Sequence, residues 1–284
     1  MKLLVLGAGG MLGNAVMKYF SNLDEYTVLG TVRNTNSTLL FPLDIQKNIL
    51  SGIDVENFDA LVKVLTEIRP NIVINCIGLV KQLLDVNDFL TAIPINSILP
   101  HRLALLTSCI NARLVHISTD CVFSGSKGAY TESDFPDAYD LYGRSKFLGE
   151  VDYPNAITLR TSIIGRELSG SRSLVDWFLS QSGSVKGYGK AIFSGLPTVE
   201  IAKIIRDFII PNPAMHGVYH VSANPISKYE LLRLVAMRYE KSLEIVLDNS
   251  IVIDRSLNSD KFRAKTGFKP ARWDELIDAM HNFK

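Results

Sequence analysis

The turn that follows the first apolar run constrains the fold more than any other feature of this sequence. Lys2–Leu6 is a short apolar run that stops at Gly7, and Met11–Phe20 has the spacing of an amphipathic helix. Gly10 and Gly13 complete a glycine triplet at this junction. A tight turn, the close approach of a pyrophosphate and the packing of helix on strand each require a glycine at such a spacing. The pattern predicts a strand, a turn and a helix that together bind a dinucleotide.

The start of this helix is itself part of the predicted cofactor site. A helix N-terminus offers unpaired N–H groups and a partial positive charge to phosphates. We therefore expect the pyrophosphate to lie against Gly7, Gly10, Met11, Leu12 and Gly13.

Apolar runs and amphipathic segments alternate over the first half of the chain. Predicted strands are Tyr26–Val32, Asn71–Cys76, Leu114–Ser118 and Ala156–Thr161, and predicted helices are Phe58–Ile68, Asn96–Ile110 and Leu141–Val151. Continuous apolar strands between such helices are typical of a parallel sheet covered on both faces. We predict an α/β fold with a Rossmann-type, doubly wound sheet.

The pattern changes after Gly165, where short helices alternate with single strands. The predicted helices are Leu174–Ser180, Val199–Ile209 and Tyr229–Tyr239, and the predicted strands are Val218–Val221 and Glu244–Leu247. We expect a dinucleotide-binding domain over residues 1–165 and a smaller α/β substrate-binding lobe over residues 166–284, with part of the chain returning to the first domain.

Composition excludes several kinds of partner. Thirty basic and twenty-nine acidic residues leave a net charge of +1, which favours neither nucleic acid nor a membrane surface. The apolar stretch Ile72–Val80 is broken by Asn75 and is shorter than the roughly 20 residues of a membrane helix. Three cysteines beside apolar runs and the lack of a leader pattern predict a cytoplasmic protein. The histidines have no metal-ligand spacing, so no metal is expected, and a homodimer remains open.

The end of the second predicted strand bears on the choice of dinucleotide. An acidic residue there would accept the ribose hydroxyls of NAD, but the sequence is Gly30-Thr31-Val32-Arg33-Asn34. Arg33 favours a 2′-phosphate and hence NADP(H), and NAD(H) is the alternative if Arg33 is an ordinary solvated side chain. Asp54 and Val55 are candidates to contact the adenine, although Asp54 is equally suited to cap the helix that follows.

A tyrosine and a lysine four residues apart suggest the chemistry. Tyr142 and Lys146 would share one face of a helix, and a nearby ammonium can stabilise a phenolate. Upstream, Ser118, Thr119 and Asp120 end a predicted strand at the carboxyl edge of the sheet, where open sheets bind ligands. We predict Tyr142 as the proton donor in a carbonyl reduction, with Lys146 lowering its pKa and Thr119 orienting the carbonyl. Ser118, Thr119 and Asp120 would contact the substrate.

Together these residues resemble the extended short-chain dehydrogenase/reductase family and, within it, the dTDP-4-dehydrorhamnose reductase group of nucleotide-sugar reductases. The segments that carry the resemblance are Gly7–Gly13, Ile68–Asn75, Ser118–Gly125, Tyr142–Lys146, Leu159–Ser162 and Asn258–Ser259 with Lys261–Phe262. The resemblance implies Thr119, Tyr142 and Lys146 as the catalytic trio, with Lys146 also holding the nicotinamide ribose. It implies hydride addition at C4 of a nucleoside-diphosphate 4-keto-6-deoxysugar, in deoxysugar biosynthesis for a surface polysaccharide.

The remaining candidates complete the predicted site. By the resemblance, Cys76, Ile77 and Gly78 face the cofactor or substrate, and Arg255 contacts the substrate phosphates. Lys81 follows this loop and is predicted at the mouth of the site. Trp177 is predicted to stack on the sugar or base, with a core or interface position as the alternative.

Two departures from the group leave other functions open. Cys121 stands where the group usually has tyrosine, and Asn75–Gly78 replaces a loop that is usually rich in alanine. One alternative is an epimerase or dehydratase with tightly bound NAD(P), although dehydratases usually carry acidic residues beside the threonine. The other is a non-catalytic regulatory subunit that holds NADP and binds a partner enzyme.

Overall fold

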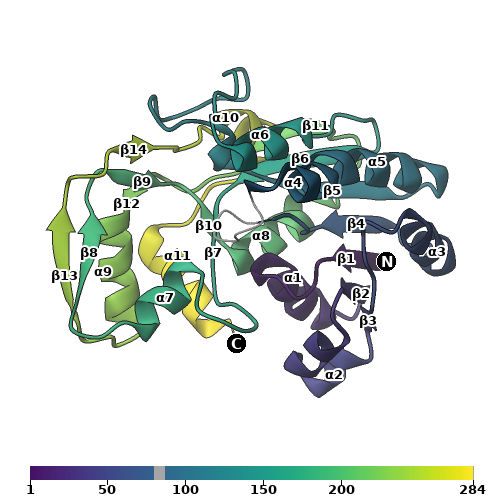
Figure 1. Cartoon of the computed structure of the whole chain (residues 1–284), viewed down its shortest axis with the longest axis horizontal. Coiled ribbons are helices and arrows are strands. Elements are labelled where there is room, and N and C mark those ends of the chain that lie inside the picture. Colours follow the sequence, from purple (N-terminus) through teal and green to yellow (C-terminus); the bar gives the residue numbers. More distant parts are fainter. Residues whose placement is uncertain (80–86, 284) are drawn as a thin grey trace.

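The continuous apolar runs form a seven-stranded sheet in which all neighbouring strands are parallel (Figure 1). The computed structural model describes residues 1–79 and 87–283. In spatial order the strands are β11 (Gly217–His220), β6 (Ala156–Thr161), β5 (Arg113–Thr119), β4 (Ile72–Asn75), β1 (Lys2–Leu6), β2 (Thr27–Val32) and β3 (Ile49–Ser51). The order reverses between β1 and β4, and doubly wound sheets bind ligands at the carboxyl ends of the strands at such a point.

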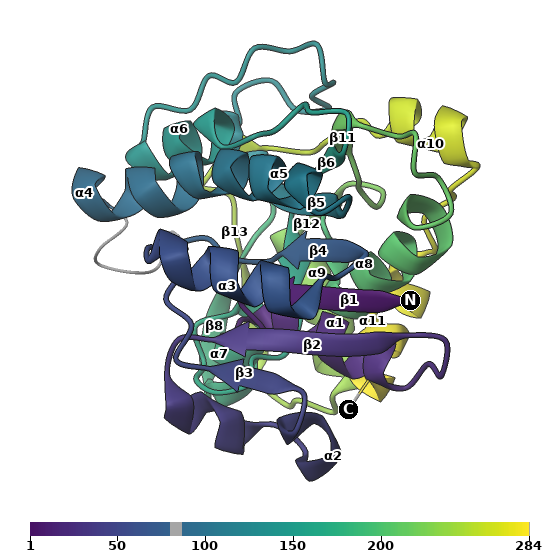
Figure 2. The same cartoon turned by 90° about the vertical axis from the view of Figure 1, so that its right-hand side faces the viewer.

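Alternate residues of β1 face two layers of helices, which lie on opposite sides of the sheet (Figure 2). Leu3 and Val5 pack in the core that contains residues of α1 (Met11–Ser21) and α8 (Thr198–Ile204). Leu4 and Leu6 pack with α3 (Phe58–Ile68) and α5 (Leu99–Cys109). A strand buried on both faces explains the unbroken apolar sequence of β1. The predicted doubly wound fold is confirmed.

One long helix runs over this sheet and contains a π-helical segment. It consists of α4 (Phe89–Ala92), the π-helical η3 (Ile93–Ile98) and α5. Over Phe89–Cys109 it has the length and composition of a membrane span, with a mean hydropathy of 1.3. Its buried side, which includes Leu99 and Leu103, packs in the core beside β1. The helix therefore covers one face of the sheet, and core helices of this kind meet the same length and composition criterion.

The chain after Gly165 builds a lobe of small sheets and also returns to the main sheet (Figure 1). Its elements are β7 (Ile163–Ile164), α7 (Leu174–Ser180), β8 (Ser184–Tyr188), β9 (Ala191–Phe193), β10 (Leu196–Pro197), β12 (Ile226–Ser227), α9 (Lys228–Arg238), β13 (Glu244–Asp248), β14 (Ile253–Asp254), α10 (Asp260–Thr266) and α11 (Trp273–Asn282). Strand β11 pairs with β6, and α8, with its π-helical extension η5 (Ile205–Ile209), packs on α1. The division between residues 165 and 166 stays a prediction.

Several elements differ from the prediction. The segments η1 (Thr35–Leu40), α2 (Leu43–Gln46) and β3 were not predicted, nor were α10 and α11. The helix predicted from Asn96 begins at Phe89, because α4 and η3 precede α5 without a break. Helix α6 (Leu141–Leu148) ends three residues before Val151, since Gly149 caps it and its N–H bonds to the carbonyls of the last turn.

Candidate active site

The glycine turn has the geometry that a phosphate site requires. Gly7 has φ +80°, and the N–H of Gly10 donates to its carbonyl at 3.0 Å. A Cβ atom on Gly13 would lie 2.1 Å from the same oxygen, so this helix residue must be glycine. Helix α1 begins at Met11, and Gly10 supplies no side-chain acceptor to its first N–H groups. These donors remain available to an anion.

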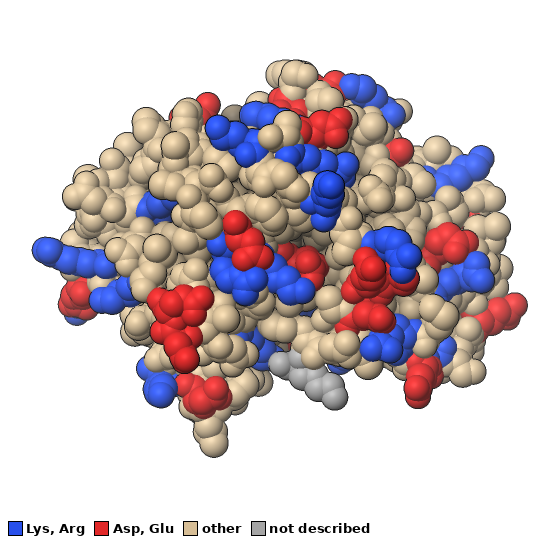
Figure 3. All heavy atoms as spheres, turned by 180° about the vertical axis from the view of Figure 1, so that it is seen from behind, with Lys and Arg blue, Asp and Glu red and all other residues tan. Residues whose placement is uncertain are grey.

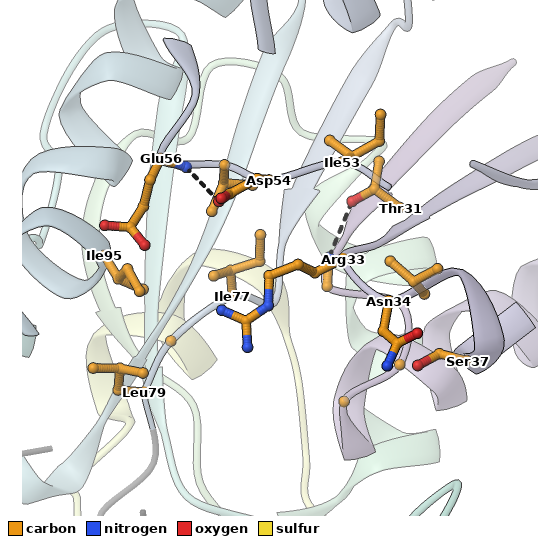
Figure 4. Close-up of a pocket in the computed structure, with 16 residues that line it drawn as sticks. Thr31, Arg33, Asn34, Ser37, Ile53, Asp54, Glu56, Ile77, Leu79 and Ile95 are labelled. Carbon is orange, nitrogen blue, oxygen red and sulfur yellow. Dashed lines mark hydrogen bonds between the residues drawn. The ribbon is translucent and has the colours of Figure 1, made fainter. Parts of the chain in front are cut away.

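A cavity of about 370 Å³ opens in front of this turn (Figure 4). Its walls come from the turn, the end of β2, the segment after β3 and the loop after β4. Seven of the predicted cofactor residues line it, namely Gly7, Gly10, Arg33, Asp54, Val55, Ile77 and Gly78. Met11, Leu12, Gly13 and Cys76 flank the cavity and are not among its lining residues. A cavity of this volume, with the glycine turn along one wall, fits a dinucleotide.

Arg33 projects into this cavity from the end of β2 (Figure 4). Its side chain is exposed, and no described residue forms an ion pair or hydrogen bond with it. Asn34 and Ser37 also line the cavity beside it and were not predicted. The first turn of η1 brings Ser37 back to the strand end, and this turn was not visible in the sequence pattern.

Asp54 lines the cavity, and its alternative role as a helix cap is wrong. Its Oδ1 accepts a hydrogen bond at 3.0 Å from the N–H of Glu56 (Figure 4). The cap of α3 is Asn57, whose Oδ1 accepts from the N–H of Ala60 at 3.1 Å. Residues 53–56 therefore precede the helix cap, and Asp54 lines the cavity wall.

Buried polar side chains that sequence reasoning missed hold the loop after β4. Asn75 Oδ1 accepts from the N–H of Ile77 at 3.1 Å, and its Nδ2 lies 3.1 Å from His116 Nδ1. Asn96 Oδ1 accepts from the N–H of Leu79 at 2.9 Å, and Asn96 Nδ2 donates to Ser145 Oγ at 3.1 Å. Asn96 thereby joins the cavity loop to α6, and it lies in the π-helical segment, a distortion frequent at functional sites. In the sequence, the signal for Asn75 and Asn96 was an asparagine within an otherwise apolar stretch.

The three predicted catalytic residues meet at the ends of β5 and α6. Asp140 caps α6 by accepting from the N–H of Gly143 at 2.8 Å, so Tyr142 lies in the first turn. A side-chain hydrogen bond joins Thr119 to the Tyr142 phenol. Lys146 is 5% exposed, and its Nζ donates to the carbonyl of Ile117 at 2.9 Å. Tyr142 and Lys146 are one turn apart on the same helix face.

Burial sets the proton affinities of this pair. It raises the pKa of Tyr142, with a smaller opposing effect from the hydrogen bond of Thr119. The nearby Cys121, Asp120 and Asp140 raise this pKa further, and the lowering effect expected of Lys146 stays a prediction. Burial also lowers the pKa of Lys146 to about 8, against the carboxylate of Glu150 and the thiol of Cys76. Near neutral pH the phenol is protonated and the lysine carries its charge, as a proton donor beside a cation requires.

The neighbours of Thr119 differ in their placement. Asp120 is 7% exposed, and its Oδ1 accepts from Thr119 Oγ1 at 3.2 Å; burial raises its pKa against the charge of Arg255. Arg255 reaches the same strand end, where its Nε donates to the carbonyl of Phe123 at 2.7 Å. Ser118, in contrast, is buried and donates to Glu150 Oε1 at 2.7 Å. This placement favours a structural role for Ser118 over the predicted substrate contact.

The other candidates are less defined. Trp177 lies on α7 and is 37% exposed, so it is not a core residue. Lys81 lies outside the described residues. Within the described part of the chain, no group of three or more His, Cys, Asp or Glu side chains is placed to hold a metal ion.

The doubly wound sheet, the glycine turn and the Thr119, Tyr142 and Lys146 arrangement define an NAD(P)-dependent oxidoreductase of the extended short-chain dehydrogenase type. The family described as "RmlD substrate binding domain" matches residues 1–282, and the chain belongs to that family.

Similar proteins agree with this assignment. The dTDP-4-dehydrorhamnose reductase of Aggregatibacter actinomycetemcomitans is 26% identical, covering 97% of each chain. Methionine adenosyltransferase 2 subunit beta of Danio rerio is 28% identical, over 83% of this chain and 73% of its own. The crystal structure of dTDP-4-dehydrorhamnose reductase from Bacillus anthracis, in complex with NADP, has a TM-score of 0.80 at 21% identity, covering 99% of this chain and 98% of its own. The last likeness is one of fold.

Proposed function

We propose that this protein is an NAD(P)H-dependent reductase of a nucleotide-linked 4-keto-6-deoxysugar. The observation that carries the proposal is the Tyr142–Lys146 pair at the carboxyl edge of the sheet, in which Lys146 is buried and a hydrogen bond joins the Tyr142 phenol to Thr119. A protonated phenol next to an ammonium is suited to give a proton to a carbonyl oxygen as it is reduced. A reductase of that substrate class among its relatives supports the choice of substrate.

The chain's own residues divide the work of the reaction. The glycine turn and the start of α1 would hold the dinucleotide pyrophosphate, and Lys146 and the 76–78 loop would hold its nicotinamide half. When bound, the cofactor supplies a hydride. Thr119 orients the substrate carbonyl, and Tyr142 donates its proton to the carbonyl oxygen. The charge of Lys146 stabilises the resulting phenolate, because a cation in a buried site interacts more strongly than in water.

NADP(H) is the favoured cofactor, and NAD(H) is the alternative. Arg33 is exposed, has no partner among the described residues and projects into the cavity, so it can pair with a 2′-phosphate. One solved structure of similar fold contains NADP, and another, the Bordetella bronchiseptica enzyme WbmG, contains NAD.

Substrate contacts and partners extend this proposal. We assign Asp120 and Arg255 to the substrate side of the trio, with Trp177 as an outer contact. The substrate contact expected of Lys81 stays a prediction. Basic and acidic residues are interspersed on the face shown in Figure 3, which fits a protein without a nucleic-acid or membrane partner. Within the described part of the chain no cysteine forms a disulfide, which fits the proposed cytoplasmic location. A homodimer is compatible with these features.

The relatives that are methionine adenosyltransferase subunits bear on the regulatory alternative. A regulatory subunit needs the dinucleotide cavity but no proton donor. The protonated, threonine-bonded Tyr142 and the charged Lys146 favour the reductase. An epimerase or dehydratase would return the hydride to the same sugar and consume no net NADPH. The reductase would consume one NADPH for each sugar reduced.

The test follows NADPH and NADH oxidation by absorbance with a panel of nucleotide-linked 4-keto-6-deoxysugars. We expect stoichiometric NADPH loss, and Tyr142→Phe should lower kcat by about 10²- to 10⁴-fold while still binding NADPH. Binding without consumption across the panel would favour a regulatory role. An isomerised sugar without net NADPH loss would favour an epimerase.

A further inference from the structure

A buried ion pair lies directly behind the catalytic trio. Glu150 follows α6 and Arg160 lies in β6, and each side chain is 4% exposed. Arg160 Nε donates to Glu150 Oε1 at 2.8 Å, and Arg160 Nη2 donates to Glu150 Oε2. Replacing such a pair by apolar residues is often neutral or stabilising, so its presence points to a role other than stability.

On the side away from the trio, Arg160 contacts His220, which adds no further charge to the ion pair. Arg160 Nη1 lies 2.8 Å from His220 Nε2, and an arginine can only donate, so that nitrogen is the acceptor. His220 Nδ1 then carries the proton and faces the carbonyls of Tyr130 and Asn258 at 3.0 and 3.2 Å. Burial, followed by the charge of Arg160, lowers the pKa of His220 to about 3. The imidazole is neutral, and the cluster carries one negative and one positive charge.

On the side toward the trio, Glu150 contacts the end of β5, which carries Thr119. Glu150 Oε1 accepts from Ser118 Oγ at 2.7 Å, one residue before Thr119. The residue before Ser118, Ile117, accepts from Lys146 Nζ at 2.9 Å. Glu150 therefore holds the strand end to which Lys146 is bonded. The Lys146 ammonium also interacts electrostatically with Glu150, Cys76 and His116.

We propose that Glu150, clamped by Arg160, is a positioning residue that fixes the end of β5 and the Lys146 ammonium relative to each other. Its carboxylate also favours the charged form of Lys146 against burial. This inference rests on the proposed function for its consequence on turnover, but the state of Lys146 can be measured without any substrate.

The test compares wild type with the double variant Glu150→Met/Arg160→Met, in which neither charge of the ion pair is left buried without the other. The double variant should fold and bind NADPH within about twofold of wild type, as measured by fluorescence titration. We expect kcat to fall about tenfold or more, because a small displacement of catalytic groups is costly. The pKa of Lys146, followed by NMR of isotope-labelled lysine and assigned with Lys146→Met, should fall below its wild-type value of about 8.

The matched control is Lys63→Ala/Glu67→Ala, which removes an exposed pair on α3 and should leave kcat and the Lys146 pKa unchanged. Wild-type kcat and Lys146 pKa in the double variant would overturn the proposal. If the double variant does not fold, Ser118→Ala removes only the strand contact; a lower kcat supports the proposal, and an unchanged kcat overturns it. Lack of turnover in wild type would overturn the proposed function, while the Lys146 pKa comparison would still decide this inference.

Discussion

Arg33 is the residue on which cofactor choice depends. It is exposed at the end of β2, points into the cavity and lies beside Asn34 and Ser37. Arg33→Ala should weaken NADPH binding by about ten- to a hundredfold, since a hydrogen bond to a charged group contributes about 1.5–3 kcal/mol. NADH affinity should change little. Titration with both cofactors checks this, and equal losses for the two would show that Arg33 does not contact a 2′-phosphate.

Lys146 predicts the pH dependence of reduction. Burial lowers its pKa to about 8, so the ammonium is present below that pH and is lost as the pH rises through it. Tyr142, whose pKa is raised, stays protonated over the same range. The rate at saturating substrate should therefore fall on the alkaline side of about pH 8. A profile that stays level to pH 9.5 would contradict the assignment of Lys146 as the required cation.

Single residues also show how far sequence alone reaches. Thr119, Tyr142, Lys146 and the glycine turn were predictable because their spacing is local to one strand end or one helix. Asn96, His116 and Glu150 were not, because their partners are distant in sequence and come together only when β4, β5 and α6 pack. The bond of Ser118 to Glu150 was hidden for the same reason, since its partner lies thirty-two residues away.

The junction of β1 and α1 makes a prediction about a whole element. A Cβ atom on Gly13 would lie 2.1 Å from the carbonyl of Gly7, so Gly13→Ala forces α1 away from the turn. We expect a loss of about 1–3 kcal/mol of stability, as for other overpacked sites, and weaker NADPH binding. Gly9→Ala is the matched control for folding, because its Cβ would approach Val32 no closer than 3.7 Å. Thermal melts of both variants provide the measurement; equal melting temperatures would refute the steric argument.

Elements buried on both faces were predicted well, and those at the edge were not. The runs of β1, β4, β5 and β6 are apolar throughout, which identifies them. Strand β3 has only three residues and becomes exposed at its end, so it carries no periodic signal. The partner of β11 was equally hidden, because a four-residue strand does not specify which sheet it joins.

The two halves of the chain share one core, and this makes a prediction for the whole molecule. Ile201 and Ile205, from the second half, pack with Val5 and Val16, from the first. A fragment of residues 1–165 would expose this face and lose β11 from the edge of the sheet. We expect it not to unfold cooperatively, as judged by circular dichroism on heating. A cooperative melt with NADPH binding would instead establish residues 1–165 as an independent folding unit.

Residues 123–129, which follow β5, are held by a segment that lies far away along the chain. The N–H of Ala129 donates to Ser256 Oγ at 2.8 Å across 127 residues, and Arg255 contacts Phe123 from the same segment. Contacts of such separation form slowly, because the intervening chain must first be ordered. During refolding, the segment with Arg255 and Ser256 should therefore dock late. We expect dinucleotide binding to recover before turnover does.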